Sequence, residues 1–269
     1  QILLLSGIGA ADELRKHGIA QQHELRGVGR HLHDHLDACT IFRCKQPITY
    51  DKTNDVWIAL QYALFRKGPG TSNIAEAGGF VRSALAPDER PDLQFHFVPA
   101  ILDDHGRSRL PGRGMTLHAC HLQPRSRGHL ELASADPTAK PKLFANYLSD
   151  ADDFDRRVLV EAVRTSRRLF KSKAFDAYRG DEMFPGDNDD SDAAISAFVR
   201  KKAETVYHPV GTCKMGTDNE SVVDPSLRVH GLQGLRVVDA SIMPKLVSGN
   251  TNAPTVMIAE RAADLMLNS

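Results

Sequence analysis

His208 precedes Pro209 in the segment Tyr207-His208-Pro209-Val210-Gly211-Thr212, near the end of this 269-residue chain. A proline disfavours the α-helical region for the residue before it, so we expect His208 on extended backbone with a fixed imidazole direction. A neutral imidazole accepts a proton near neutral pH, because its ordinary pKa is about 6.5. His208 is therefore a candidate general base that takes the proton of a hydroxyl group, as the oxidation of an alcohol requires. The alternative is a structural histidine in a loop.

Asn252 is the second candidate, in the segment Gly249-Asn250-Thr251-Asn252-Ala253-Pro254-Thr255. Proline suits the first turn of a helix, so the sequence predicts a helix over residues 255–268 that begins beside Asn252. Apolar residues recur there at helical spacing and predict a buried face, formed by Val256, Met257, Ala259, Ala263 and Met266. The free N–H groups at a helix N-terminus favour a negative charge, and Asn252 beside them is placed to hydrogen-bond a substrate oxygen. Alternatively, Asn252 only forms the turn or caps the helix.

A strand is predicted from Leu235 to Val238, because this mostly apolar, β-branched run is typical of a covered sheet. Asp239 and Ala240 follow at the point where the strand would end. Ligands bind in crevices at such strand ends, and small residues let backbone amides approach them closely. The alternative is an ordinary turn after a strand.

These three segments together resemble the closing region of the glucose-methanol-choline (GMC) flavin oxidoreductases. Further blocks resemble the same family along the rest of the chain. They are the opening run Gln1-Ile2-Leu3-Leu4-Leu5-Ser6-Gly7-Ile8-Gly9, the block Gly27-Val28-Gly29-Arg30-His31-Leu32-His33-Asp34-His35, Ser126-Arg127-Gly128, and Val222-Val223-Asp224-Pro225. Within the family, the chain looks most like the bacterial alcohol dehydrogenases and choline dehydrogenases.

The resemblance implies FAD as cofactor and the oxidation of an alcohol to an aldehyde, with His208 as the base, Asn252 as its partner, and flavin N5 as the hydride acceptor. It places Asp239 and Ala240 at the flavin nucleotide, and Asn252 and Thr255 beside the isoalloxazine. Glu76 aligns with a substrate-pocket carboxylate that choline-oxidising members use against the ammonium group. An exposed turn residue is the alternative for Glu76. The implied partners are a small-molecule alcohol and a quinone or other electron acceptor, and the sequence leaves oxygen open as the acceptor.

The Gly-x-Gly-x-x-Gly turn that holds a dinucleotide pyrophosphate is missing from the sequence. Gly7 and Gly9, like Gly27 and Gly29, lack the third glycine. We therefore expect a truncated chain, the carboxyl-terminal half of a longer enzyme, which does not retain FAD by itself. Two alternatives remain, a flavin-dependent hydroxynitrile lyase and a non-catalytic substrate-cap module.

The composition excludes some classes of function. Lys and Arg together number 34, as do Asp and Glu, so the chain lacks the basic surface of a nucleic-acid-binding protein. The four cysteines show no C-x-x-C spacing, so neither a zinc site nor a disulfide framework is indicated. The alternating His31, His33 and His35 suggest a metal, but no cysteine or carboxylate pattern accompanies them, and we expect none. A cytoplasmic location is expected, with peripheral association with the inner membrane as the alternative.

The predicted fold class is α+β, a remnant of an α/β FAD-binding domain joined to a substrate domain built on an antiparallel sheet flanked by helices. The expected domains are residues 1–36, the FAD-domain remnant; 37–204, the substrate-binding domain; and 205–269, the FAD-domain segment with the active-site His and Asn. Strands are predicted over 39–43 and 93–98, and over 115–122 and 129–133 as an antiparallel pair. Helices are predicted over 10–17, 55–66, 150–171 and 190–203.

Overall fold

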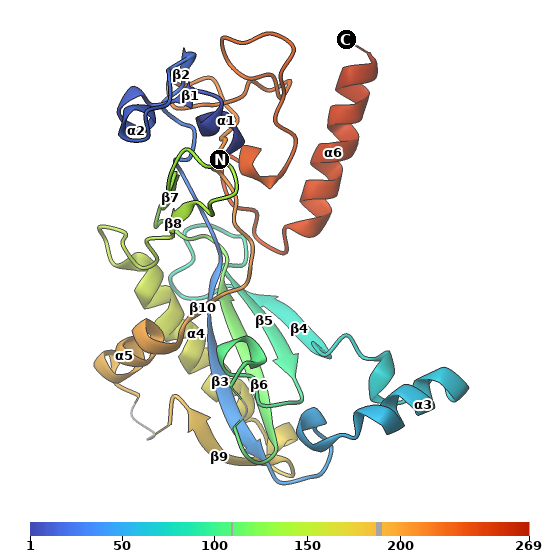
Figure 1. The fold of residues 1–269 in the computed structure, drawn as a ribbon. Helices are drawn as coiled ribbons and strands as arrows, with labels where there is room; N and C mark the ends of the chain where they lie inside the picture. Colours follow the sequence, from blue (N-terminus) through green and yellow to red (C-terminus); the bar gives the residue numbers. More distant parts are fainter. Residues whose placement is uncertain (109, 187–189, 269) are drawn as a thin grey trace. The chain divides into compact units, whose positions relative to one another are not determined.

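The computed structural model describes residues 1–108, 110–186 and 190–268 (Figure 1). The chain divides into two compact units. Unit 1 comprises Gln1–His35, Gln123–Phe154 and Tyr207–Ser269, and unit 2 comprises Leu36–Leu122 and Asp155–Val206. We describe each unit by itself. The expected α+β class is confirmed, because helices accompany a sheet whose strands pair in the antiparallel direction.

Unit 2 is built on a six-stranded sheet. The strand order is β10-β3-β6-β5-β4, β9 also pairs with β3, and all of these pairs are antiparallel. The strands are β3 (Leu36–Cys44), β4 (Ala77–Val81), β5 (Leu93–Val98), β6 (Gly114–His121), β9 (Arg179–Phe184) and β10 (Glu204–Thr205). The strands expected over 39–43 and 93–98 are confirmed as β3 and β5.

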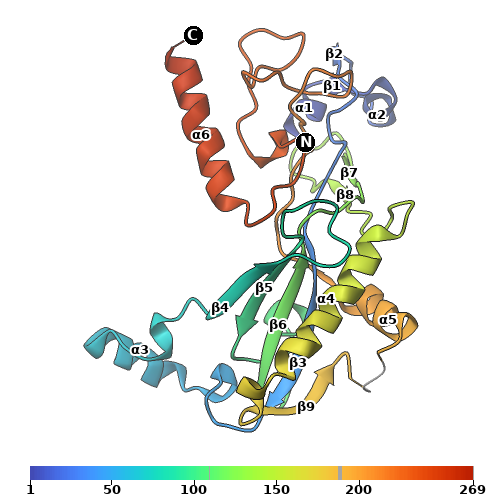
Figure 2. The same ribbon diagram turned by 180° about the vertical axis from the view of Figure 1, so that it is seen from behind.

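The two faces of this sheet carry different side chains, because successive residues of a strand point to opposite sides. One face is apolar and is covered by the helix α4 (Phe154–Phe170), which lies across it in Figure 2. There the ring of Phe170 lies 4.6 Å from that of Phe42 and 6.4 Å from that of Phe97. The other face includes Asp37 and Cys39, which share a side because they are two residues apart on β3.

The other helices of unit 2 follow local sequence signals. They are α3 (Asp55–Phe65), α5 (Asp192–Lys202) and the 3-10 helices η1 (Tyr50–Lys52), η2 (Pro69–Thr71), η3 (Asp104–Gly106) and η4 (Lys173–Phe175). The side chain of Asn54 accepts a hydrogen bond from the Trp57 N–H and caps α3, and Ser191 caps α5 in the same way. Over the described ranges, none of the helices is both long enough and apolar enough to cross a membrane.

Unit 1 consists of short elements around one apolar core. They are α1 (Ile2–Leu5), β1 (Ile8–Gly9), α2 (Ala11–Lys16), β2 (His23–Glu24), β7 (His129–Glu131), β8 (Lys142–Phe144), η5 (Ala240–Ile242) and α6 (Asn252–Leu267). The core joins all three segments of the unit, since Leu4, Leu132, Val210 and Ile258 belong to the same cluster. Burial of this apolar surface is what assembles the unit from distant parts of the chain.

The expected strand pair over 115–122 and 129–133 is wrong. β6 pairs with β3 and β5, whereas β7 pairs with β8. Residues 123–154, expected within the 37–204 domain, belong to unit 1. The reason is packing, because Leu132 is buried in the unit 1 core and its N–H donates to the Glu13 carboxylate at 3.0 Å.

Two expectations near the C-terminus are also wrong. Leu235–Val238 is not a strand, and its one ladder contact is an isolated bridge between Arg228 and Arg236. Helix α6 begins at Asn252, three residues before the expected start, and buries Ile258 and Ala262. The apolar residues expected to be buried are instead exposed, namely Val256, Met257, Ala259, Ala263 and Met266. Both patterns were judged by apolar spacing alone, which does not say which side of an element is covered.

Candidate functional site

His208 lies in unit 1, and its imidazole contacts a second histidine, His35. The two Nδ1 atoms are 3.0 Å apart. The ring centroids are 5.2 Å apart and the ring planes are nearly perpendicular, at 86°. His35 is completely buried, whereas His208 is half-buried. The contact uses Nδ1 of His208 and not Nε2.

The main chain of His208 is fixed by a carboxylate from the same block as His35. The His208 N–H donates to Asp34 Oδ1 at 2.9 Å. The Tyr147 hydroxyl donates to the other oxygen of the same carboxylate. Tyr207 has a φ of +60°, in the left-handed region. His208 lies outside any helix or strand, as the following proline predicts, and a turn delivers it to this position.

Two main-chain hydrogen bonds hold together the segments that carry this histidine pair. The His33 N–H donates to the Val210 oxygen and the Val210 N–H donates to the His33 oxygen, each at 2.9 Å. Gly211 follows with a φ of +94°, and a Cβ there would lie 2.2 Å from the His31 oxygen. This close approach needs a glycine at position 211, because any side chain would push the two segments apart.

The surroundings of His208 favour its neutral form. Burial lowers the pKa of His208 below its usual value, and the Asp34 carboxylate opposes this shift. His33 is affected more strongly, since burial, with Arg127 and His31, lowers its pKa to about 3. A neutral imidazole at pH 7 has a lone pair and is able to accept a proton.

Asp239 and Ala240 lie next to the loop that follows His208. The Cys213 N–H donates to the Ser241 oxygen at 2.9 Å. The Asp239 side chain accepts from the Ser241 N–H at 2.7 Å and caps the short helix η5. The structure therefore brings the predicted nucleotide-contacting residues into the same unit as His208 and joins them to it through one loop.

Asn252 and Thr255 lie at the start of α6, which shares its core with η5. Asn252 is exposed, and the Thr255 hydroxyl donates to the Thr251 oxygen at 2.7 Å. The N-cap residue of α6 is Thr251, not Asn252, and the Thr251 side chain makes no capping hydrogen bond. The first turn of α6 carries no acidic residue. The positive end of the helix dipole there is compatible with the negative charge of a reduced flavin, so the residues present fit FAD.

Glu76 lies in unit 2, so its relation to His208 stays a prediction. Its carboxylate is exposed and accepts a hydrogen bond from the Tyr50 hydroxyl. Hydrogen bonds from Ser72 and then Tyr50 lower the pKa of Glu76. The three residues that follow it, 77–79, line an apolar cavity of about 480 Å³ together with Phe95, Phe97 and Phe175.

Neither His35 nor Tyr147 was predicted as a site residue from the sequence. His35 was noted as one of three alternating histidines, in the block with glycines and Asp34 that resembles the family's. The signal was incomplete, because the contact joins residues 173 positions apart in the chain. Tyr147 carried no signal at all.

Comparison with known proteins places these residues in a family context. Residues 124–259 match the family model described as GMC oxidoreductase. An alcohol dehydrogenase (acceptor) from Pseudomonas putida is 48% identical over 99% of this chain and 49% of its own length. Oxygen-dependent choline dehydrogenase 1 from Chromohalobacter salexigens is 44% identical over 98% of this chain and 48% of its own length. The chain therefore spans about half the length of the curated relatives it matches.

Solved structures agree with the sequence relatives. A variant of the Aspergillus oryzae RIB40 formate oxidase, studied for its FAD modification, superposes with a TM-score of 0.89 at 28% identity, over 98% of this chain and 51% of its own. A pyridoxine 4-oxidase from Mesorbium loti gives a TM-score of 0.85 at 26% identity, over 99% of this chain and 49% of its own.

Proposed function

Since the chain belongs to the GMC oxidoreductase family, we propose that it supplies the acid–base residues of an FAD-dependent enzyme that oxidises a small alcohol. The observation that carries the proposal is the 3.0 Å contact between the Nδ1 atoms of His208 and His35. This contact engages Nδ1 of His208 and leaves Nε2 as the nitrogen proposed to accept a proton, and alcohol oxidation begins with removal of the hydroxyl proton.

His208 is the proposed base, acting through Nε2. In the neutral pair, His208 carries its hydrogen on Nδ1 and donates it to Nδ1 of His35, which then has its own hydrogen on Nε2. The contact allows either histidine to donate, and the proposal takes His208 as the donor because this leaves a lone pair on its Nε2. When Nε2 of His208 takes the hydroxyl proton, the Nδ1–H bond to His35 stays in place. The imidazolium is then stabilised by a neighbour that was already oriented, so no rearrangement is needed.

His35 is a positioning residue in this scheme, because it touches His208 and not the substrate. Asp34 holds the His208 main chain and opposes the effect of burial on its pKa. That carboxylate therefore also favours the protonated form once the proton has arrived.

FAD, when bound, supplies the acceptor for the hydride that leaves the carbinol carbon. Asp239 and Ala240 are the proposed contacts to its nucleotide, and Asn252 and Thr255 the proposed contacts beside its ring system. Asn252 also orients the substrate oxygen in this proposal. The N-terminus of α6, whose first turn carries no acidic residue, supports this placement, because its N–H dipoles favour a developing negative charge.

The substrate is proposed to be a small alcohol, and the electrons then pass to a quinone or another acceptor. Glu76 is the proposed contact for a cationic substrate such as choline. The apolar, phenylalanine-lined cavity that adjoins residues 77–79 supports this idea, since aromatic rings attract alkylammonium groups.

A chimaera tests the proposal. In it, this chain replaces the matching half of the Pseudomonas putida relative, which it covers at 48% identity. The chimaera should bind FAD, and an alcohol added without oxygen should bleach the flavin. His208→Gln should slow this reduction by about 10²–10⁴-fold, the usual contribution of a general base, and leave the amount of bound flavin unchanged.

His23→Gln is the matched control, because His23 also lies in unit 1 and bonds the main-chain oxygen of His230. In the His23→Gln chimaera, the alcohol should reduce the flavin at the rate measured for the parent chimaera. A His208→Gln chimaera that bleaches within about threefold of the parent contradicts the base role. A parent that binds FAD but is never bleached by any alcohol contradicts the oxidation itself and favours chemistry without net redox, such as that of a hydroxynitrile lyase.

A further inference from the structure

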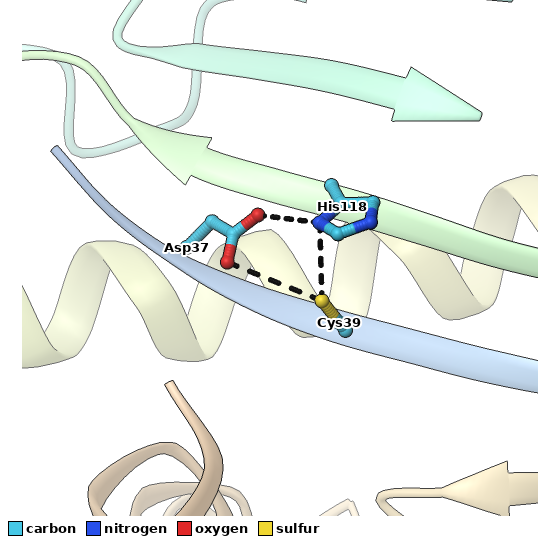
Figure 3. Close-up of side chains that lie close together, drawn as sticks. All are labelled: Asp37, Cys39 and His118. Carbon is cyan, nitrogen blue, oxygen red and sulfur yellow. Dashed lines mark hydrogen bonds and ion pairs between the residues drawn. The ribbon is translucent and has the colours of Figure 1, made fainter. Parts of the chain in front are cut away.

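Three side chains of unit 2 meet on the face of the sheet opposite α4. Asp37 and Cys39 come from β3, and His118 comes from β6, where it is the register partner of Cys39 (Figure 3). His118 Nδ1 lies 2.7 Å from Asp37 Oδ2 and 3.1 Å from Cys39 Sγ, and Sγ lies 4.0 Å from Asp37 Oδ1. One oxygen, one sulfur and one nitrogen atom all lie within 4.8 Å of one another.

The cluster is enclosed but not sealed. The side chain of Asp37 is 2% exposed and that of His118 is 21% exposed. Cys39 is buried as well. An ion from solvent can therefore reach the cluster past the imidazole, while the carboxylate and sulfur stay protected from water.

The charges around the cluster favour a cation. Cys39 interacts electrostatically with three carboxylates, those of Asp37, Glu204 and Asp103, and with one ammonium group, that of Lys202. The ammonium group is paired with Asp103 at 2.7 Å. Asp37 and Glu204 are paired with histidines, His118 at 2.7 Å and His105 at 3.3 Å. Their charges are balanced only while these imidazoles are protonated, and a metal ion would supply the balancing charge when they are neutral.

We propose that Asp37, Cys39 and His118 bind one divalent metal ion of the zinc type. Zinc prefers this mixture of thiolate sulfur, imidazole nitrogen and carboxylate oxygen, whereas magnesium and calcium prefer oxygen ligands alone. Three protein ligands leave a fourth tetrahedral position for water, on the side where His118 is exposed. This inference is independent of the proposed alcohol oxidation.

The present distances are close to those that a tetrahedral ion requires. With metal–ligand bonds of about 2.0–2.3 Å, neighbouring ligand atoms lie roughly 3.3–3.6 Å apart. The contacts from His118 Nδ1 to Asp37 Oδ2 and to Cys39 Sγ, at 2.7 and 3.1 Å, are shorter than this range, and Sγ lies 4.0 Å from Oδ1, the other oxygen of the same carboxylate. Shifts of less than about 1 Å would admit the ion. The two strands that carry the ligands are paired over their whole shared length, so their backbones are already in place.

A reactive cysteine is the alternative use of such a cluster. Reactive cysteines are partly exposed, whereas Cys39 is buried beneath the sheet neighbours that enclose the cluster. This burial argues against the alternative.

The test uses the whole chain, freed of metal by a chelator and titrated with Co²⁺, which substitutes for zinc and absorbs light when a thiolate binds it. We expect thiolate-to-cobalt absorption that saturates at one ion per chain and disappears when Zn²⁺ is added. Cys39→Ser should abolish the absorption. Cys44→Ser is the matched control, since Cys44 lies buried on the same strand outside the cluster, and it should titrate like the parent. Circular dichroism should show that both variants are folded.

A measurement on the unsubstituted chain covers the case in which Cys39→Ser does not fold. Zn²⁺ should slow alkylation of Cys39, followed on its peptide by mass spectrometry, by at least tenfold. Alkylation of the half-buried Cys213 in unit 1 should be unchanged. The proposal is wrong if the parent shows no thiolate absorption, if Cys44→Ser loses it as fully as Cys39→Ser, or if Zn²⁺ leaves the alkylation of Cys39 unchanged.

Discussion

Two histidines of this molecule have opposite surroundings. His208 in unit 1 faces another imidazole, that of His35, at 3.0 Å, whereas His118 in unit 2 faces the Asp37 carboxylate at 2.7 Å. Burial lowers the pKa of His208. Burial alone would also lower the pKa of His118, but the hydrogen bond and charge of Asp37 outweigh it, and that pKa lies above its usual value.

Burial lowers the pKa of an imidazole, and a carboxylate hydrogen-bonded to the ring can reverse that effect. The His208 ring contacts another imidazole, so the effect of burial prevails and His208 stays uncharged and able to take a proton at neutral pH. A carboxylate neighbour keeps His118 charged in the metal-free chain, or gives a metal ion a second ligand beside it. The first arrangement is suited to acid–base chemistry and the second to holding a cation.

Replacing His35 should have the largest effect on the difference between the two histidines, and it should appear in the rate of flavin reduction. His35→Leu removes the acceptor of the His208 Nδ1–H, so the productive tautomer and ring direction are no longer fixed. We expect flavin reduction in the chimaera to fall about 10²-fold, in line with the loss of an orienting partner of a catalytic histidine. His35→Asn keeps an acceptor oxygen near Nδ1 and should restore most of the rate. A purely structural role would make both variants equally slow and would lower their thermal stability in parallel.

Removing the charge beside His118 should have a smaller effect. It should change the free energy of unfolding and not the rate of flavin reduction. Asp37→Asn replaces a charge-assisted hydrogen bond by a neutral one. We expect the free energy of unfolding at pH 6 to fall by about 1–3 kcal/mol, measured by urea denaturation of the metal-free chain. Asp136→Asn, at an exposed site bonded to Thr138, should not change it measurably. Equal stabilities for Asp37→Asn and the parent would show that the carboxylate does not hold His118 charged.

The two histidines should titrate in opposite directions from their usual pKa of about 6.5. His118 has a raised pKa, so its contribution to stability is complete below about pH 6.5 and is lost as the pH rises through the folded-state value. His208 has a lowered pKa, so its neutral folded form is favoured above about pH 6.5, and stability is lost as the pH falls below it. NMR of labelled imidazoles at pH 6.5 should find His118 mainly charged and His208 mainly neutral. The reverse order would contradict the comparison.

Local patterns were enough to predict much of the fold. The strands β3 and β5 and the helices α3 and α5 were expected close to their observed bounds, because alternation, capping residues and glycines act within a few positions. The partners of β6 were not predictable in this way. Strand pairing depends on contacts between distant segments, and a short loop after a strand does not guarantee a hairpin.

The same distinction between local signals and distant contacts applies to the candidate site. His208 was predicted as a candidate base from its own segment, because the proline after it restricts its backbone and the segment resembles the family's closing region, which are local signals. His35 and the cluster of Asp37, Cys39 and His118 were not, because their partners are 173 and 79 positions away. The cysteine spacing argued against zinc, yet the register between β3 and β6 places a cysteine opposite a histidine. Motif spacing finds ligands that are close in sequence and misses those that a sheet brings together.

Replacing Glu76 should have the smallest of these effects. It would separate a residue that recognises the charge of the substrate from His208, which acts on its hydroxyl group. Its carboxylate is exposed, and its pKa is lowered by hydrogen bonds from Ser72 and Tyr50, so it is charged at neutral pH. Glu76→Gln in the chimaera should raise the KM for choline severalfold and leave the KM for a neutral primary alcohol unchanged, since exposed charges interact weakly through water. His208→Gln, in contrast, should slow both substrates alike. An equal rise in KM for the charged and the neutral alcohol would remove Glu76 from substrate recognition, and with it the proposed carboxylate contact to a cationic substrate.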